Sequence, residues 1–500
     1  MEDTLQEKLI SETEQPKPNL EKGIIITSET NEEDLKFVFN RIAAAAGKLA
    51  VSFFCNFGTR GLLVYYLKGT NQPVVQAAAT LGLALLSVLS MTVFVSLNAG
   101  GLFYRLTHTY GAKDFRLMGL YLHRGCIINV IALVVCSILV TSSIPAFRKF
   151  GYEEDLLEHM ATFIYWSLPS LIGFSFFQIF NSYLNAADIF HVSSQVQIAS
   201  CVAYVISGYI LIVQMELGII GAVLTLNIQQ TTSLIYILIY IYKNNPVPGT
   251  LFPLEEDSYK GLWDLFKYQF TSGAMLFLEY GGYEMIYLFA GILSVPEVAG
   301  LMTALFCQAN FFAFALSVSI ATSGFVGNAM GELKVQKAKF YLKVGTFMNL
   351  GVVLIAELIV GIFAPNLARF YSNDPDTIAE TTRVLRLFML VFPTDYVGVV
   401  MAGGMRSIGL EKAGSMIVLV NLYCISMPLT AILVLAADAG VTGVMMAFIV
   451  APLLNVCCYI YQFKKTNWEE QAFMISRKLK KDHEELKNDQ IDEGQEMTDL

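Results

Sequence analysis

Four acidic residues lie inside stretches of the chain that are otherwise almost wholly apolar: Glu279, Glu284, Glu357 and Asp395. A charged side chain at the centre of a bilayer costs about 2.5–3.5 kcal/mol on insertion scales, so residues of this kind are functional candidates by default. A carboxyl group kept from water can take up and release a proton as its exposure changes, which is the chemistry that a proton-coupled transporter needs. We therefore expect Glu279, Asp395 and Glu284 to contact the coupling cation or the substrate, and Glu357 to make a hydrogen bond to a neighbouring span.

Aromatic and amide side chains in the apolar stretches are candidates for lining a cavity. A run of tyrosines beside Glu279 could hold a flat cation by cation–π contact, although such stripes more often serve packing: Tyr280, Tyr283 and Tyr287. A stripe of amides with spacing i, i+3 and i+7 could either line a wet cavity or join helices by hydrogen bonds: Gln178, Asn181 and Asn185. Pro169 and Pro393 each remove a backbone donor inside an apolar stretch, and are candidate kinks for gating.

The composition limits what these residues can do. The chain is 55% hydrophobic and only 15% charged, whereas a soluble domain carries roughly 25% charge. The net charge of −9 comes from the ends, because residues 1–38 hold 4 basic and 10 acidic residues, residues 464–500 hold 7 and 10, and the remainder holds 22 of each. No basic face remains for nucleic acid, and no metal-binding spacing, phosphate loop or nucleophile motif is visible. We expect a polytopic membrane protein that is not an enzyme and needs no metal or other cofactor.

The elements that must position these residues are membrane-spanning helices. A spanning helix needs about 20 apolar residues, and at about 35 residues per helix and loop the stretch 39–463 holds twelve. They are expected at 39–67, 74–100, 119–142, 160–185, 194–214, 218–242, 264–293, 297–325, 342–364, 383–405, 413–436 and 441–463. The acidic residues 1–38 and the charged residues 464–500 are expected to be disordered tails.

The loop charges predict the orientation of these helices. Thirteen Lys and Arg residues lie in the loops after even-numbered spans, against four in the loops after odd-numbered spans. Because Lys and Arg mark the cytoplasmic side, both tails are predicted to be cytoplasmic. The plasma membrane and the membrane of an acidic organelle both remain open.

The chain also repeats itself. The motif at 110–114 is echoed at 330–334, Pro169 is echoed by Pro393, and the motif at 217–222 is echoed at 439–444, at offsets of 220, 224 and 222 residues. Six spans per half give two repeats with the same orientation in the membrane. Proteins built in this way commonly bind substrate between the repeats and rock one half against the other.

Several motifs resemble those of the multidrug and toxic compound extrusion (MATE) family, particularly its eukaryotic branch. The segment 109–124 resembles the family signature after the second span, and Leu-Glu-Tyr-Gly-Gly-Tyr-Glu at 278–284 is similar to its seventh-span motif. The segment 326–331 resembles the stretch after the eighth span, and Asp395 with Arg406 resembles the tenth-span signature. The resemblance covers residues 40–463 but neither tail.

The resemblance implies two six-helix lobes, here 39–242 and 263–463 with a linker at 243–262, and export of organic compounds, usually cations, driven by H⁺ or Na⁺. By motif match, Glu279 and Asp395 are the cation-coupling acids and Glu284 assists them. The sequence departs from the family pattern in three places, which bear on substrate range more than on fold. Gly281 replaces the second aromatic, Phe325 replaces the usual Arg, and Lys48 lies in the region where a Pro is usual.

We therefore predict a monomeric antiporter in the lipid bilayer that exports a small organic cation in exchange for H⁺ by alternating access, with Na⁺ as the other coupling ion. The alternative is a lipid-linked or oligosaccharide flippase on the same two-lobed plan. A flippase would be favoured by a cavity lined with Arg and Lys, and the basic content of the spans, mainly Lys48 and Arg60, argues against it.

Overall fold

The computed structural model describes residues 34–68, 73–149, 153–290, 295–371, 374–437 and 439–496. Within these ranges the chain is almost entirely helical and forms no strand. Among the described residues, eleven segments are long and apolar enough to span a membrane. The remaining expected span, the seventh, is α10 (Leu262–Ala290), which is 29 residues long. The predicted all-α membrane fold is confirmed.

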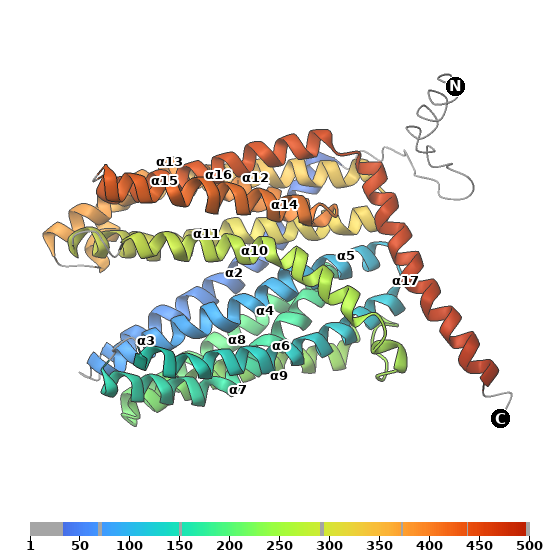
Figure 1. Cartoon of the computed structure of the whole chain (residues 1–500), viewed down its shortest axis with the longest axis horizontal. Helices are drawn as coiled ribbons and strands as arrows, with labels where there is room; N and C mark the ends of the chain where they lie inside the picture. Colours follow the sequence, from blue (N-terminus) through green and yellow to red (C-terminus); the bar gives the residue numbers. More distant parts are fainter. Residues whose placement is uncertain are drawn as a thin grey trace, which may run out of the picture.

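The first six spans form one bundle, drawn from blue to green in Figure 1. Its second span is continuous over Val74–Gly111, because short π-helical turns join three α-helical pieces. The helices are α2 (Leu35–Lys68), α3 (Pro73–Leu86), α4 (Thr92–Leu97), α5 (Phe103–Gly111), α6 (Phe115–Lys149), α7 (Glu154–Ala186), α8 (His191–Gly208) and α9 (Gly218–Asn244).

The last six spans form a second bundle, drawn from yellow-green to red (Figure 1). After α10 its helices are α11 (Val295–Gly331), α12 (Val335–Tyr371), α13 (Pro375–Ser407), α14 (Glu411–Val418), α15 (Met427–Ala431) and α16 (Gly440–Lys465). Most of the helices extend a few residues beyond the predicted spans, because hydropathy detects only the part that matches the apolar core of a bilayer. Residues 35–38, assigned from sequence to a tail, are the first turn of α2.

The two bundles meet at the end of the molecule where α17 (Trp468–Glu496) lies (Figure 1). Two glycines from the repeated motifs make the closest approach. Gly111 at the end of α5 faces the backbone carbonyl of Asn328, and Gly331 at the end of α11 faces the backbone carbonyl of His108. The repeated motifs thus pack against each other, and each uses a glycine because a Cβ would collide with the backbone of the other bundle.

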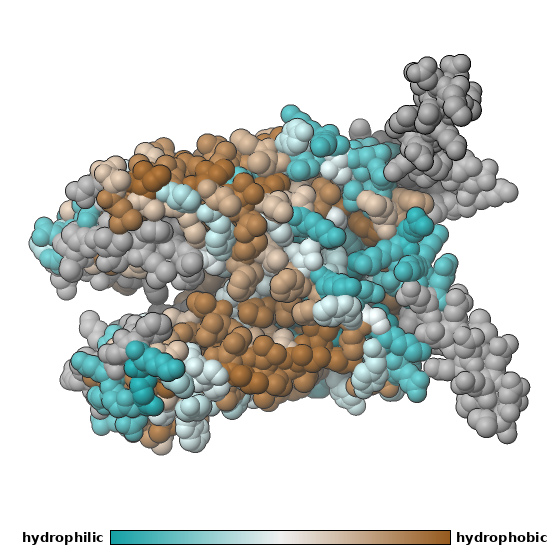
Figure 2. Space-filling model, in the orientation of Figure 1, coloured by the Kyte–Doolittle hydropathy of each residue, from teal (hydrophilic) through white to brown (hydrophobic). Residues whose placement is uncertain are grey.

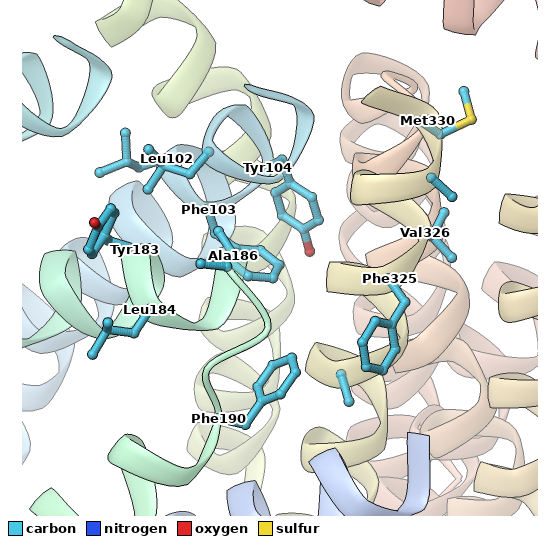
Figure 3. Close-up of a cluster of buried hydrophobic side chains, with 14 of the residues drawn as sticks. Leu102, Phe103, Tyr104, Tyr183, Leu184, Ala186, Phe190, Phe325, Val326 and Met330 are labelled. Carbon is cyan, nitrogen blue, oxygen red and sulfur yellow. The ribbon is translucent and has the colours of Figure 1, made fainter. Parts of the chain in front are cut away.

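An apolar core surrounds this contact and belongs to both bundles. Figure 3 shows Phe190, which precedes α8, facing Phe325 of α11, with ring centroids 5.8 Å apart. The core continues into α5 and α7 through Phe103 and Tyr183. This end of the molecule is therefore closed by side chains from both halves of the sequence.

The opposite end is open. In Figure 2 a notch separates the two bundles there, and a broad apolar band covers the outer surface between more polar ends. Large apolar residues are exposed on helices of both bundles, among them Ile131, Ile138, Ile355 and Ile362. A band of this kind matches the hydrocarbon region of a bilayer.

The expectation that residues 464–500 are disordered is wrong over most of that segment, because Trp468–Glu496 form α17. The high charge conceals a buried stripe. Trp468, Ala472, Ile475 and Leu479 recur at helical spacing and are all buried against the core. An amphipathic helix of this composition is stabilised by the surface that it covers rather than by its own hydropathy.

Candidate functional site

Two of the membrane acids lie in the second bundle, within electrostatic reach of each other. Glu279 lies in the middle of α10 and Asp395 in the second half of α13, close enough for their charges to interact. Arg406 interacts with Glu279, and Tyr459 of α16 interacts with Glu279, Asp395 and Arg406. We call these four residues the acidic site. Asp395 is 8% exposed and Tyr459 2%, whereas Glu279 is half-buried, so Asp395 is largely kept from water and Glu279 keeps some exposure.

Arg406 connects the acidic site to the boundary between the bundles. Its guanidinium carbon lies 5.4 Å from the centroid of the Tyr104 ring on α5. The side chain is 6% exposed, and its Nε and Nη1 atoms have no hydrogen-bond partner among the described residues. The cation of Arg406 therefore lies within electrostatic reach of Glu279 and over an aromatic face of the other bundle. A change of charge at the acids bears directly on that contact.

Both candidate kinks lie inside continuous helices, Pro169 in α7 and Pro393 in α13. Side chains of neighbouring helices donate hydrogen bonds to backbone carbonyls of α13 just beyond Pro393. Asn349 Nδ2 lies 2.7 Å from the carbonyl oxygen of Tyr396, and Ser319 Oγ lies 2.9 Å from that of Val399. The backbone beside Asp395 is thus fixed by hydrogen bonds from α11 and α12. A gating role for the two prolines stays a prediction.

The amide stripe on α7 joins two helices. Ser193 of α8 donates to Asn181 Oδ1 at 2.5 Å and to Asn185 Oδ1 at 2.9 Å. Of the two alternatives left open by the sequence, a bridge between helices describes these two residues. Gln178, further along the stripe, is half-buried.

The remaining predicted residues follow Glu279 on α10. Tyr280 is half-buried. The side chains of Tyr283, Glu284 and Tyr287 lie outside the described part of the chain, although their backbone is helical. Their roles stay predictions.

A cavity that the sequence analysis missed lies in the first bundle. Its volume is about 30 Å³, enough for one or two water molecules. The polar part of its lining comes from α2, α8 and α9: Asn56, Thr59, Tyr204, Gln229 and Gln230. Gln229 Nε2 donates to Thr59 Oγ1 at 3.2 Å. The available signal was the presence of amides in two apolar spans, but nothing in their spacing shows that the spans are adjacent.

A polar cluster at the closed end also escaped the sequence analysis. Arg41 of α2 donates to Asp188 Oδ2 at 3.0 Å and to the Tyr341 hydroxyl at 2.8 Å. Its guanidinium carbon lies 4.5 Å from the centroid of the Phe325 ring, and Asn328 Nδ2 donates to the other Asp188 oxygen at 2.9 Å. We call these five residues the latch. Arg41 and Asp188 belong to the first bundle and the other three to the second, so the latch ties the halves together.

The latch contains a carboxyl group whose protonation is sensitive to its surroundings. Burial raises the pKa of Asp188 to about 6, although the neighbouring Arg41 acts in the opposite direction. Arg41 supplies a guanidinium over the ring of Phe325. Within the described residues, no group of three or more His, Cys, Asp and Glu could hold a metal ion.

The sequence matches the MatE family model over residues 49–210 and 272–432, a stretch from each half of the chain. It is similar to Multidrug and toxin extrusion protein 1 of Oryctolagus cuniculus, with 21% identity over 398 residues, 78% of this chain and 69% of the relative. It is also similar to Protein DETOXIFICATION 49 of Arabidopsis thaliana, with 25% identity over 365 residues, 73% of each chain.

The fold is similar to that of solved transporters. The crystal structure of the eukaryotic MATE transporter AtDTX14 aligns with a TM-score of 0.83 at 16% identity, covering 89% of this chain and 99% of that one. An outward-facing multidrug resistance MATE family transporter of the MOP superfamily aligns with a TM-score of 0.76 at 14% identity, covering 88% and 97%. At these identities the likeness establishes the fold alone.

Proposed function

Because this chain belongs to the MatE family of membrane transporters, we propose that it is a monomeric antiporter that exports small organic cations in exchange for protons. The observation that supports the proposal most directly is the acidic site, where a half-buried Glu279 and a buried Asp395 lie within electrostatic reach of each other. Two such carboxyl groups cannot both stay ionised at low cost, so they bind either protons or another cation. A carboxylate pair is a suitable receptor for an organic cation, and Tyr459 adds an aromatic ring.

The exchange follows from competition for the same charge. When the site is open to the exterior, protons bind at Glu279 and Asp395 and weaken the hold on the organic cation. By linkage, a bound cation disfavours the protons to the same extent. Each tenfold change in affinity corresponds to about 1.4 kcal/mol. If a bound cation lowers the affinity for protons a hundredfold, the coupling free energy is about 3 kcal/mol.

The proposal assigns the two ends of the molecule to the two sides of the membrane. With both tails in the cytoplasm, the closed end that holds the latch faces the cytoplasm and the notch faces outward. Inward opening then requires Arg41 and Asp188 to separate from Tyr341 and Asn328. Pro169 and Pro393 are the proposed points of bending, and Glu284, Tyr280, Tyr283, Tyr287 and Gln178 are proposed to line the substrate path.

Efflux from proteoliposomes tests this function. Ethidium, a flat fluorescent cation, is loaded into the vesicles, and a pH gradient or a sodium gradient is imposed separately. We expect the pH gradient to drive ethidium transport and the Glu279→Gln variant to lose this response, because an amide cannot exchange a proton. Wild-type transport that is indifferent to the pH gradient, or full gradient-driven activity in Glu279→Gln, would overturn the proposed coupling. A response to sodium alone would replace the proton by Na⁺.

The flippase alternative gains no support from the cavity of the first bundle. A headgroup with phosphate charges needs Arg or Lys in the cavity wall, whereas the residues that line this cavity are polar and uncharged or apolar.

A further inference from the structure

Glu357 is a buried acid that the proposed exchange does not use. It lies on α12, is 2% exposed, and accepts a hydrogen bond from Gln308 Nε2 of α11 at 2.6 Å. The expected bond to a neighbouring span is therefore confirmed. The second carboxyl oxygen, Oε2, has no hydrogen-bond partner among the described residues.

The amide of Gln308 connects Glu357 to the helix that carries Asp395. The same Nε2 atom lies 2.5 Å from the hydroxyl oxygen of Tyr396, the residue that follows Asp395 on α13. Gln308 is 2% exposed and Tyr396 is fully buried. The rings of Phe312 and Phe392 lie against Tyr396 with centroids 5.4 and 5.2 Å away, which keeps the network dry.

The charge state of Glu357 depends on few groups. From α11 it meets the amide of Gln308, and Gln308 in turn contacts the Tyr396 hydroxyl of α13. Burial and the Gln308 hydrogen bond are the effects that bear on its charge among the described residues. Within the described part of the chain no cation offsets a negative charge there, and an ionised carboxylate held by one neutral donor is costly in a dry interior.

An amide side chain can serve either protonation state of this acid. Its NH₂ group donates two hydrogen bonds, which suits an ionised Glu357 and the lone pairs of Tyr396. After a half-turn its carbonyl oxygen accepts, which suits a protonated Glu357 hydroxyl and the O–H of Tyr396. In the present structure that carbonyl oxygen, Gln308 Oε1, has no hydrogen-bond partner among the described residues. The orientation of Gln308 therefore depends on whether Glu357 carries a proton.

We propose that Glu357 is a second proton-binding residue of the transport cycle, and that Gln308 transmits its protonation to Tyr396 and so to the segment of α13 that carries Asp395. This inference rests on the proposed proton coupling and adds a carboxyl group that the family motifs do not contain. Glu357 lies 14 residues before Tyr371, the last residue of α12, or about 21 Å along the helix. Asp395 lies 20 residues after Pro375, the first residue of α13, or about 30 Å along the helix. Glu357 is thus nearer to the end that holds the notch, from which we propose that protons enter.

Proton release on binding tests the inference. Purified protein in a weakly buffered solution is titrated with ethidium at a series of pH values, and the protons released per bound ethidium are counted with a pH indicator. If Glu357 loses its proton when the cation binds, Glu357→Gln should release about one proton fewer than the wild type where both sites titrate. Glu357→Asp should recover part of the difference. Glu158→Gln, which changes an exposed glutamate of α7, is the matched control and should release as many protons as the wild type.

The outcomes separate the two proposals. Equal proton release by Glu357→Gln and the wild type would overturn the role of Glu357 and leave the coupling at Glu279 intact. No release by the wild type would overturn the proposed coupling itself. If Glu357→Gln does not fold, Gln308→Leu keeps the acid and removes the amide. A shift in the pH at which that variant releases protons is then expected, and an unshifted profile would contradict the relay.

Discussion

At Asp188, burial and a guanidinium act in opposite directions on one carboxyl group. Burial has the larger effect and raises the pKa from 3.8 to about 6, while the contact with Arg41 lowers it. An acid with a raised pKa in the folded state binds its proton more tightly there than in the unfolded chain. The folded state therefore loses stability as the pH rises from 3.8 towards 6, and the loss is complete above that range.

Asp188→Asn should remove this pH dependence, because an amide does not titrate. We expect the melting temperature of the wild type, followed by fluorescence in detergent, to fall relative to that of Asp188→Asn as the pH rises from 3.8 to about 6. Asp376→Asn changes an exposed carboxyl at the start of α13 and serves as the control. A constant difference between wild type and Asp188→Asn across this range would contradict the assignment.

Sequence reasoning finds single residues when their type is unusual for their surroundings. Glu279 and Asp395 were predicted because acids are rare in apolar spans, and the structure brings them within reach of each other. Arg41 and Asp188 were missed because each lies near the end of a span, where charge is ordinary. Gln308 was missed because an amide in a span has no distinguishing pattern. What makes these three residues notable is their partners, which lie far away in the chain. Arg41 is 147 residues from Asp188 and 300 from Tyr341, and Gln308 is 49 residues from Glu357.

The helices themselves were largely predictable from sequence, since long apolar runs determine where they lie. The contacts between helices depend on small residues such as glycine, and a hydropathy profile does not show which of these residues lie at a contact. Gly331 faces the carbonyl of His108 in the other bundle, whereas Gly351 on α12 has open space beside it. Replacing each of these two glycines by alanine distinguishes the effect of a contact between helices from the effect of helix propensity.

We expect Gly331→Ala to destabilise the closed end. The added methyl group meets backbone that cannot yield without moving a helix, and overpacking of this kind costs about 1–3 kcal/mol. Gly351→Ala should be neutral or slightly stabilising, because alanine favours a helix. Melting temperatures of the two variants give the comparison, and equal values would show that the contact between α5 and α11 does not matter for stability.

α17 was mistaken for a disordered tail because its charged residues outnumber its apolar ones. The helix bridges both bundles. On the side of the first bundle, the Tyr121 hydroxyl donates to Asp482 at 2.5 Å and His483 Nδ1 lies 3.1 Å from Asp114. Its apolar stripe, including Ile475, packs into the core that the two bundles share. The C-terminal helix thus helps to hold the closed end together.

Two neighbouring residues of α17 test this contact. Ile475 is 7% exposed and Met474 is 46% exposed. Ile475→Ala should lower the free energy of unfolding by about 2 kcal/mol or more, because it leaves a cavity in the core. Met474→Ala should change it by less than about 0.5 kcal/mol. Similar losses for the two variants in urea unfolding would mean that α17 does not pack as described.

At the scale of the whole molecule, the repeat gives the two bundles matching contacts. The motifs at 110–114 and 330–334 meet at the closed end, where each supplies the glycine that the other requires. The acidic site, in contrast, belongs to the second bundle, and the small polar cavity to the first. The internal repeat predicted the two-bundle plan, but it could not predict this division of polar groups, because the acids have no counterpart in the first half.

The central claim is that Glu279 and Asp395 bind protons as one unit. The most direct measurement is a double-mutant cycle on pH-driven ethidium efflux, with Glu279→Gln, Asp395→Asn and both together. Residues that act as a unit lose most of their effect with the first substitution. We predict that each single variant abolishes the response to the pH gradient and that the double variant is no worse than either. Two partial losses that multiply in the double variant would show independent acids and contradict the account.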